Sequence, residues 1–104
     1  EQQRILTFRG IRIDLNTYEV TVAGKKVELT SREIKLLSFM IRHPGRVYTR
    51  EELLDYVWGN ESFVEPRTVD VHISRLRSII EPDKEKPRYI LTVRSLGYKF
   101  ADNE

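Results

Sequence analysis

The chain has 104 residues, of which 39% are hydrophobic and 33% are charged, and its formal net charge is +2. This balance is typical of one folded globular domain rather than a disordered chain. The chain has no cysteine, which excludes disulfides, thiolate metal sites and a cysteine nucleophile. No apolar run approaches the roughly 18–20 residues of a membrane span and no signal peptide opens the chain, so we expect a cytoplasmic location and no membrane contact.

Residues 5–29 have the alternating pattern of a small antiparallel sheet with one buried face. Apolar residues alternate with polar ones at Ile11 and Ile13, at Tyr18, Val20 and Val22, and at Val27 and Leu29. The pairs Asn16-Thr17 and Ala23-Gly24 fall where hairpin turns are expected.

A first helix is predicted over about residues 30–43. Thr30-Ser-Arg-Glu33 is a capping box, in which the Thr hydroxyl accepts from the Glu backbone N–H and the Glu carboxylate accepts from the Thr backbone N–H. Apolar residues at helical spacing follow, and Pro44 disfavours helix at the residue before it.

A second helix is predicted over about residues 49–58, after a short strand at Val47-Tyr48. It opens with a second capping box, Thr49-Arg-Glu-Glu52, and Gly59 is suited to end it. Residues 59–65 then form a loop, after which Pro66 can occupy the first turn of another helix.

Residues 66–81 form a predicted third helix with two different sides. Val69, Ile73, Leu76 and Ile80 recur at spacings of four, three and four, which is the stripe of a helix docked on a core. The opposite side is basic, short in side chain and rich in hydrogen-bonding groups. It carries Arg67, Val71, Ser74, Arg75 and Ser78, with Arg77 at its flank. In a major groove about 12 Å wide, Arg can fork onto a guanine edge and Val can contact a thymine methyl, so we predict sequence-specific binding to double-stranded DNA.

The positive charge is concentrated in the last third of the chain. Residues 1–65 hold ten Lys or Arg and ten Asp or Glu, whereas residues 66–100 hold eight basic and four acidic residues. On charge alone, a solvated basic surface and a nucleic-acid-binding surface are equally compatible with this excess.

The chain ends in a predicted β-hairpin over residues 89–100, with its turn at Arg94-Ser-Leu-Gly97. The order of elements predicts an α+β fold. It is a winged helix-turn-helix with an N-terminal antiparallel β-sheet, a three-helix core and a C-terminal β-hairpin wing, in one domain over residues 1–104.

Several runs match one protein family in order and spacing. They are Leu29-Thr-Ser-Arg-Glu33, His43-Pro-Gly-Arg-Val-Tyr-Thr-Arg-Glu-Glu-Leu-Leu54, Val57-Trp-Gly59, Arg67-Thr-Val-Asp-Val-His-Ile-Ser-Arg-Leu-Arg77, and Thr92-Val-Arg94 with Gly97-Tyr98. From about Leu6 to Phe100 the chain resembles the C-terminal effector domain of OmpR/PhoB-type response regulators. The resemblance implies a four-stranded N-terminal sheet and a role in transcription regulation by a two-component system.

The resemblance also implies partners that lie outside these 104 residues. A receiver domain, phosphorylated by a cognate sensor kinase, would precede the segment, which begins at Glu1 rather than Met. Relatives bind direct-repeat operators as head-to-tail dimers and contact RNA polymerase through the loop that corresponds to residues 59–65. Because the segment has no long apolar dimer seam, we expect a monomer in solution and a dimer on DNA.

The family pattern assigns DNA contacts to the third helix, the end of the second helix and the wing. Arg67, Thr68 and Arg77 would hold phosphates, and Asp70, Val71, Ser74 and Arg75 would face base edges. Trp58 would donate its indole N–H to a phosphate. In the wing, Thr92 would contact the backbone and Arg94 would enter a narrow minor groove. Relatives usually carry a basic residue in place of Ser74, and Gly in place of Ser95.

Each of these residues also has a structural alternative. Trp58 can be a core residue with a polar edge, and Arg94 can be a solubilising charge. Arg67 and Arg77 can pair with Asp70 or Glu81 on the same helix. Asp70 can orient a nearby Arg or accept from a cytosine amino group. For His72, a buried, hydrogen-bonded side chain is favoured over a ligand role.

Catalysis is the contrasting function, and the sequence gives it no support. The chain has no HExxH, GxSxG, P-loop or Cys/His metal spacing, so we predict no enzyme, cofactor or metal site. A winged helix that binds protein or RNA remains an alternative, as does a parent protein that is a membrane-tethered activator without a receiver.

Overall fold

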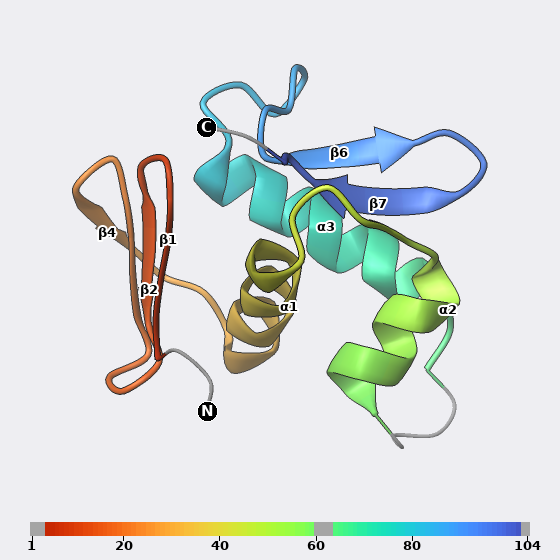
Figure 1. Ribbon diagram of the computed structural model, residues 1–104, viewed down its shortest axis with the longest axis horizontal. Helices are drawn as coiled ribbons and strands as arrows, with labels where there is room; N and C mark the ends of the chain where they lie inside the picture. Colours follow the sequence, from red (N-terminus) through yellow and green to blue (C-terminus); the bar gives the residue numbers. More distant parts are fainter. Residues whose placement is uncertain (1–3, 60–63, 103–104) are drawn as a thin grey trace.

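The structure is a computed structural model that describes residues 4–59 and 64–102. Its N-terminal strands form a four-stranded antiparallel sheet in the order β1-β2-β3-β4. These strands are β1 (Ile5–Phe8), β2 (Ile11–Asp14), β3 (Glu19–Val22) and β4 (Lys25–Val27). Figure 1 shows this sheet on one side of the first helix, where its buried face packs. The expected four-stranded sheet is confirmed.

The two sheet turns differ in how well the sequence predicted them. The turn at Ala23-Gly24 is confirmed, and both residues have positive φ, +52° and +80°, as a type I′ hairpin requires. The placement of Tyr18 in a strand was wrong. Its N–H closes a turn by donating to the carbonyl of Asp14 at 2.6 Å, which fixes its φ at +61° and leaves its ring 58% exposed. Leu29 lies beyond the end of β4 and is half-buried.

Both predicted capping boxes are present. Helix α1 (Ser31–Arg42) starts at Thr30, whose hydroxyl accepts from the backbone N–H of Glu33 at 3.1 Å. The carboxylate of Glu33 accepts from the backbone N–H of Thr30 at 2.9 Å. The same two bonds, at 3.0 and 2.9 Å, link Thr49 to Glu52 at the start of the second helix.

The second helix changes its winding after one turn. Helix α2 (Arg50–Leu53) continues as the π-helical segment η1 (Leu54–Trp58), which the sequence pattern did not predict. Gly59 ends the segment with φ +67°, and its N–H donates to the carbonyl of Leu54 at 3.0 Å. A wider turn rotates the last residues of the helix relative to a regular α-helix, so it sets the direction in which Trp58 projects.

Helix α3 (Arg67–Ile80) directly follows Pro66 and ends at Glu81. Its predicted apolar stripe is confirmed, because the four residues of that stripe are at most 2% exposed. They are Val69, Ile73, Leu76 and Ile80. Figure 1 shows α3 running across the molecule below the C-terminal hairpin, with α2 near its N-terminal end.

The wing is the hairpin of β6 (Ile90–Val93) and β7 (Gly97–Phe100). Strand β7 also pairs with β5 (Val47–Tyr48), so the second sheet has the order β5-β7-β6. The predicted fold class, an α+β winged helix-turn-helix, is confirmed. None of the helices in the described ranges has the length and apolar character to cross a membrane.

Gly97 occupies a position where a side chain does not fit. Its φ is +152°, and a Cβ there would overlap the carbonyl oxygen of Tyr48 on β5. Gly24 also has positive φ, +80°, but a Cβ there would meet nothing within 4 Å. The two glycines therefore separate the cost of an unusual backbone angle from the cost of a steric overlap.

We predict that Gly97→Ala lowers the free energy of unfolding by about 3 kcal/mol or more, because β5 and β7 must move apart. Gly24→Ala should cost only about 1 kcal/mol, for the backbone angle alone. Urea unfolding followed by tryptophan fluorescence measures both values. Equal losses in the two variants would contradict the steric role of Gly97.

Candidate nucleic-acid interface

The outer side of α3 is open to solvent, as its sequence pattern predicted. The five residues that the pattern placed on this side are all exposed, and Val71 is 62% exposed. They are Arg67, Val71, Ser74, Arg75 and Ser78. A helix with one fully buried stripe and one exposed, short, polar side can enter a groove of another molecule without losing its own packing.

Arg75 is held in place by the buried carboxylate of Glu33 on α1. Its Nε lies against Oε2 of Glu33, whose side chain is 2% exposed, while the Arg75 side chain is 56% exposed. The other oxygen of Glu33 accepts from the backbone N–H of Thr30. One carboxylate thus caps α1 and fixes the guanidinium of Arg75 on the outer side of α3. A buried, paired charge of this kind strongly restricts the rotamer of its partner.

Arg77 connects α3 to the wing. Its Nε and Nη2 donate to the carbonyl of Ile90 at 3.0 and 2.8 Å, and Nη2 also donates to the hydroxyl of Thr92 at 2.8 Å. Its guanidinium carbon lies 5.6 Å from the ring centroid of Tyr98. The alternative in which Arg77 pairs with Asp70 or Glu81 was wrong, because β6 offers its backbone carbonyl within reach.

Asp70 connects α3 to both neighbouring elements. One carboxylate oxygen accepts from the hydroxyl of Tyr98 at 2.6 Å and the other accepts from Nη1 of Arg50 at 2.9 Å. Tyr98 belongs to the wing and Arg50 opens α2. The orienting alternative for Asp70 therefore fits this geometry, since both oxygens are already engaged within the protein.

The burial of Tyr98 and its contact with Asp70 shift the pKa of the Tyr98 phenol. Burial, and then the hydrogen bond to Asp70, raise the pKa of Tyr98 from 10.0 to about 12. The charges of Arg77 and Arg50 act in the opposite direction but are outweighed. The neutral phenol is the form that donates to the carboxylate, so the contact between α3 and the wing depends on it.

The start of α3 presents side chains rather than free backbone N–H groups. The N–H of Thr68 donates to the carbonyl of Glu65 at 2.9 Å, and that of Val69 donates to the carbonyl of Pro66 at 3.0 Å. Arg67 pairs with Glu65 at 3.4 Å, and both side chains are more than 70% exposed. This pairing differs from the expected partners Asp70 and Glu81, and such an exposed pair is weak enough to exchange for a phosphate.

Trp58 is only 7% exposed, so the structure places it in the core with an edge near the surface. The guanidinium carbon of Arg32 lies 5.3 Å from its ring centroid, and the ring of His72 packs edge-on at 5.1 Å. His72 is half-buried and its Nδ1 lies 2.9 Å from the carbonyl of Thr68. The hydrogen bond expected of His72 is confirmed, whereas its side chain is half-buried rather than buried.

The wing tip keeps its turn without glycine. Ser95 has φ +66°, a left-handed conformation that favours Gly, and the N–H of Leu96 donates to the carbonyl of Val93 at 2.9 Å. Arg94 is exposed at this tip. A non-glycine residue in this conformation costs about 1 kcal/mol or more, so the surrounding hairpin enforces the turn.

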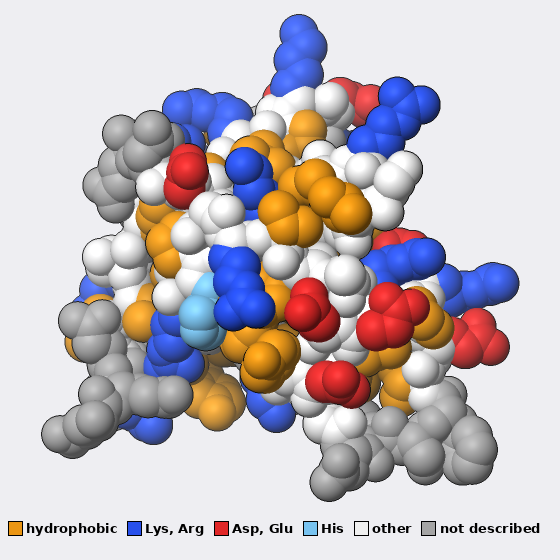
Figure 2. Space-filling model, turned by 45° about the vertical axis from the view of Figure 1, so that its right-hand side comes forward, with side chains coloured by type: hydrophobic (Ala, Val, Ile, Leu, Met, Phe, Trp, Pro, Cys, Tyr) orange, Lys and Arg blue, Asp and Glu red, His pale blue; other side chains and the backbone are white. Residues whose placement is uncertain are grey.

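Figure 2 shows the side of the molecule that carries α2 and the wing turn. Lys and Arg side chains lie beside Asp and Glu side chains there, with hydrophobic side chains between them. The surface is therefore mixed rather than uniformly basic. Such a surface favours selective recognition through individual side chains over strong non-specific attraction.

Three residues of this arrangement were not identified from the sequence as parts of the site. Arg50, Tyr98 and the second role of Glu33 depend on contacts between elements that lie far apart in the chain. Arg50 did carry a signal, because a cation in the first turn of a helix opposes the helix dipole and needs another reason to be there.

The loop predicted to contact RNA polymerase, residues 59–65, lies partly outside the described residues, which omit 60–63.

The raised pKa of Tyr98 predicts a pH dependence. Because its pKa is higher in the folded state, the stabilisation is fully present below pH 10 and is lost as the pH rises towards 12. Absorbance at 295 nm should show one phenol titrating near pH 12 that is missing in Tyr98→Phe. Asp70→Asn should move that titration towards 10. An unchanged titration in Asp70→Asn would contradict the role of the carboxylate.

Comparison with known proteins places the chain in a family. Residues 24–100 match the family described as "Transcriptional regulatory protein, C terminal". The chain is 42% identical over 99 residues to the phosphate regulon transcriptional regulatory protein PhoB of Escherichia coli, covering 95% of this chain and 43% of that protein. The chain thus spans less than half the length of this relative.

Two solved structures have the same fold. The response regulator DrrB of Thermotoga maritima, an OmpR/PhoB homologue, is 38% identical with a TM-score of 0.87, over 96% of this chain and 45% of DrrB. The RstA DNA-binding domain of Klebsiella pneumoniae, solved in complex with the RstA box, is 32% identical with a TM-score of 0.83, over 95% and 98%. The chain therefore belongs to the family of C-terminal transcriptional regulatory domains, of the OmpR/PhoB type.

Proposed function

We propose that this domain binds double-stranded DNA in a sequence-dependent manner, with α3 in the major groove and the wing at the adjacent minor groove. The observation that carries the proposal is the division of α3 into a fully buried stripe and an exposed side with Arg75 at its centre. The DNA complex of the related RstA domain supports the same class of ligand. A single module of this size would bury about 600–1,000 Å² on DNA.

Arg75 is the proposed base reader. Glu33 holds Nε of its guanidinium, which leaves the Nη groups at the outer end of the side chain available for a guanine edge. Val71, one turn before Arg75, and Ser74, directly before it, lie on the same exposed side, where a thymine methyl and a base hydrogen bond suit them. Asp70 serves in this proposal to orient Arg50 and Tyr98 rather than to contact a base.

Phosphate contacts would surround this base-reading centre. Arg67 and Thr68 at the start of α3 and Thr92 on the wing would bind the backbone through their side chains. Arg77 would fix the wing and direct its remaining N–H groups to a phosphate. Trp58 would reach a phosphate with the edge of its indole. Four to six such contacts correspond to a slope of about −4 to −5 in log affinity against log salt.

Arg94 would enter the minor groove from the wing tip. The Arg77 and Tyr98 contacts hold the hairpin against α3, so the distance between the two reading elements is set by the protein rather than by the DNA. An exposed Arg at that end would favour a narrow, AT-rich minor groove, where the negative potential is enhanced.

We also propose that the domain is the effector part of a two-component response regulator in the cytoplasm. A receiver domain and its cognate sensor kinase would control it, and a direct-repeat operator would bind two copies. RNA polymerase would contact the loop of residues 59–65. The chain covers only 43% of PhoB, so these partners lie outside it. This part of the proposal therefore rests on family membership.

Arg75→Ala tests base reading. We expect it to lose roughly 1–3 kcal/mol of discrimination at one or two base pairs of a selected duplex, with little change at the others. Anisotropy titrations against all single-base variants of that duplex measure this. Arg12→Ala in β2 is the matched control, because it also removes one exposed positive charge. A uniform loss over all variants would exclude Arg75 as a base reader.

Glu33→Gln separates the two roles of that carboxylate. Gln still completes a capping box, so the stability of α1 should be retained, whereas the charge that fixes Arg75 is removed. We expect a partial loss of discrimination at the base pairs that Arg75→Ala affects, and no additional loss in the double variant. Additive losses in the double variant would show that Glu33 does not act through Arg75.

Arg67→Ala tests a phosphate contact. It should weaken binding to all duplexes alike and make the salt dependence shallower by about one in slope. Titrations of wild type and variant over a series of salt concentrations give this slope. An unchanged slope would remove Arg67 from the phosphate-binding set.

A further inference from the structure

Lys84 adds a cation to the outer side of α3 from a different segment of the chain. Residues 81–89 connect α3 to β6, and Lys84 in this connection is exposed. A shallow hollow of about 540 Å³ lies over the outer side of α3, and Lys84 lines it together with five residues of that helix. They are Asp70, Val71, Ser74, Arg75 and Ser78.

Lys84 also lies close to the wing. A second hollow, of about 420 Å³, lies between α3 and the wing, and its lining includes Arg77, Tyr98 and Lys84. Asp70, Ser74 and Lys84 line both hollows. Lys84 therefore stands at the border between the outer side of α3 and the junction of α3 with the wing.

Short side chains of α3 keep this border open. Ser74 and Ser78 are exposed, and the hydroxyl of Ser78 donates to the carbonyl of Arg75 at 2.7 Å, so it lies against its own helix. The flexible stem of a Lys is much longer than a Ser side chain. The amine of Lys84 can therefore extend past both serines towards a ligand.

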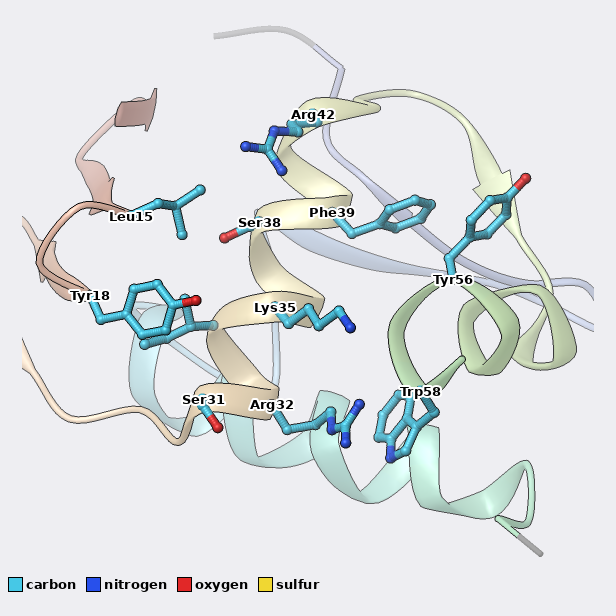
Figure 3. A pocket seen from close by; sticks show the side chains of 11 residues that line it. Leu15, Tyr18, Ser31, Arg32, Lys35, Ser38, Phe39, Arg42, Tyr56 and Trp58 are labelled. Atoms are coloured by element: carbon cyan, nitrogen blue, oxygen red, sulfur yellow. The ribbon is translucent and has the colours of Figure 1, made fainter. Parts of the chain in front are cut away.

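The charge of Lys84 is not committed within the fold. In the described ranges 4–59 and 64–102, Lys84 takes part in no ion pair. Figure 3 shows a contrasting cation beside α1, where Arg32 lies next to Trp58 and also donates to the carbonyl of Val57 at 2.7 Å. Arg32 is held by its own fold, whereas the charge of Lys84 is available to a ligand.

Two acidic residues line the hollow between α3 and the wing. Both carboxylate oxygens of Asp70 are engaged, one by Tyr98 and the other by Arg50. Glu85 is exposed next to Lys84 and lines this hollow but not the one over the outer side of α3. A polyanion that crosses the junction meets these two negative charges, and Lys84 lies where its positive charge offsets them.

The path of a DNA strand explains why a cation at this border matters. Neighbouring major and minor grooves of a duplex share one wall, which is the sugar-phosphate backbone of a single strand. With α3 in the major groove and the wing at the adjacent minor groove, that strand has to cross the junction between them. A side chain at the junction then meets phosphate oxygens rather than base edges.

We propose that Lys84 binds a phosphate of the strand that passes between α3 and the wing. Its amine pairs with the phosphate as a compact point charge. The contact fixes the position of the duplex along α3 but carries no sequence information. It rests on the DNA-binding function proposed above, and it adds the connection between α3 and β6 to the surface that holds the duplex.

Lys84→Gln tests the contact, and Lys86→Gln is its matched control. Lys86 is exposed in the same connection but lines neither hollow. Anisotropy titrations of a selected duplex and its single-base variants, over a series of salt concentrations, measure both. Lys84→Gln should lower the affinity about fivefold at physiological salt for every duplex and make the salt slope shallower by about one. Lys86→Gln should match wild type in both quantities.

Two results of these titrations would overturn the proposal. Equal effects of Lys84→Gln and Lys86→Gln would show that the loss of one positive charge, rather than its position, weakens binding. A loss confined to particular base pairs would show that Lys84 contacts a base edge instead of a phosphate.

Duplexes with one uncharged methylphosphonate linkage locate the phosphate. For wild type, neutralising the phosphate that Lys84 binds should weaken binding, whereas Lys84→Gln should be insensitive at that position and remain sensitive at the others. The position should lie between the base pairs affected by Arg75→Ala and those affected by Arg94→Ala. A position outside that interval, or no position at which Lys84→Gln loses sensitivity, would contradict the contact.

The same titrations separate a failure of this contact from a failure of the proposed function. If the wild-type domain binds no duplex, the proposed function is wrong and the Lys84 contact is wrong with it. If the wild type binds and Arg75→Ala loses discrimination, but Lys84→Gln behaves like Lys86→Gln, only the Lys84 contact is wrong.

Discussion

The wing and α3 are held in one fixed relation, and the candidate interface depends on it. Arg77 donates three times to β6, and Asp70 accepts from Tyr98 on β7. At the other end of α3, the buried carboxylate of Glu81 accepts from the backbone N–H groups of Arg88, Tyr89 and Ile90. Two charged side chains of α3, and that of the residue directly after it, thus secure the hairpin along its length. Joined in this way, α3 and the wing present a surface of fixed shape, which limits the conformational entropy lost on binding.

Acidic residues are used here for positioning rather than for solvation. Glu33, Asp70 and Glu81 each engage backbone N–H groups or basic side chains at the junction of two elements. The charge of +2 therefore understates the basic character of the outer side of α3, because part of the negative charge is committed inside the fold. A domain built this way would gain specificity from oriented groups more than affinity from total charge.

Local signals in the sequence predicted most of the fold. The two capping boxes and the spacing of the buried stripe on α3 each act within a few residues, and the structure shows both. The π-helical end of the second helix and the turn at Tyr18 were missed, because hydrophobic spacing does not encode a local change of winding or a positive φ. The contact partners of Arg75, Arg77 and Asp70 were also out of reach, since they join residues 13 to 42 positions apart in the chain.

For the site, the sequence predicted which residues of α3 face outward but not how they are held. The pattern of small and basic residues fixes a direction around the helix, whereas the length and flexibility of Arg leave its end undetermined without a partner such as Glu33. Trp58 illustrates the same limit. Its position near the end of the second helix was evident, but its burial beside Arg32 and His72 follows from tertiary packing.

The central claim is that the exposed side of α3 reads the sequence of a DNA duplex. Selection of bound molecules from a random duplex library at moderate salt, with the wild-type domain, tests it most directly. The account predicts enrichment of a short motif with a guanine-containing core flanked by an AT-rich step. Retention of duplexes without any enriched motif, lost as salt is raised, would contradict it, because the surface would then recognise only the phosphate backbone.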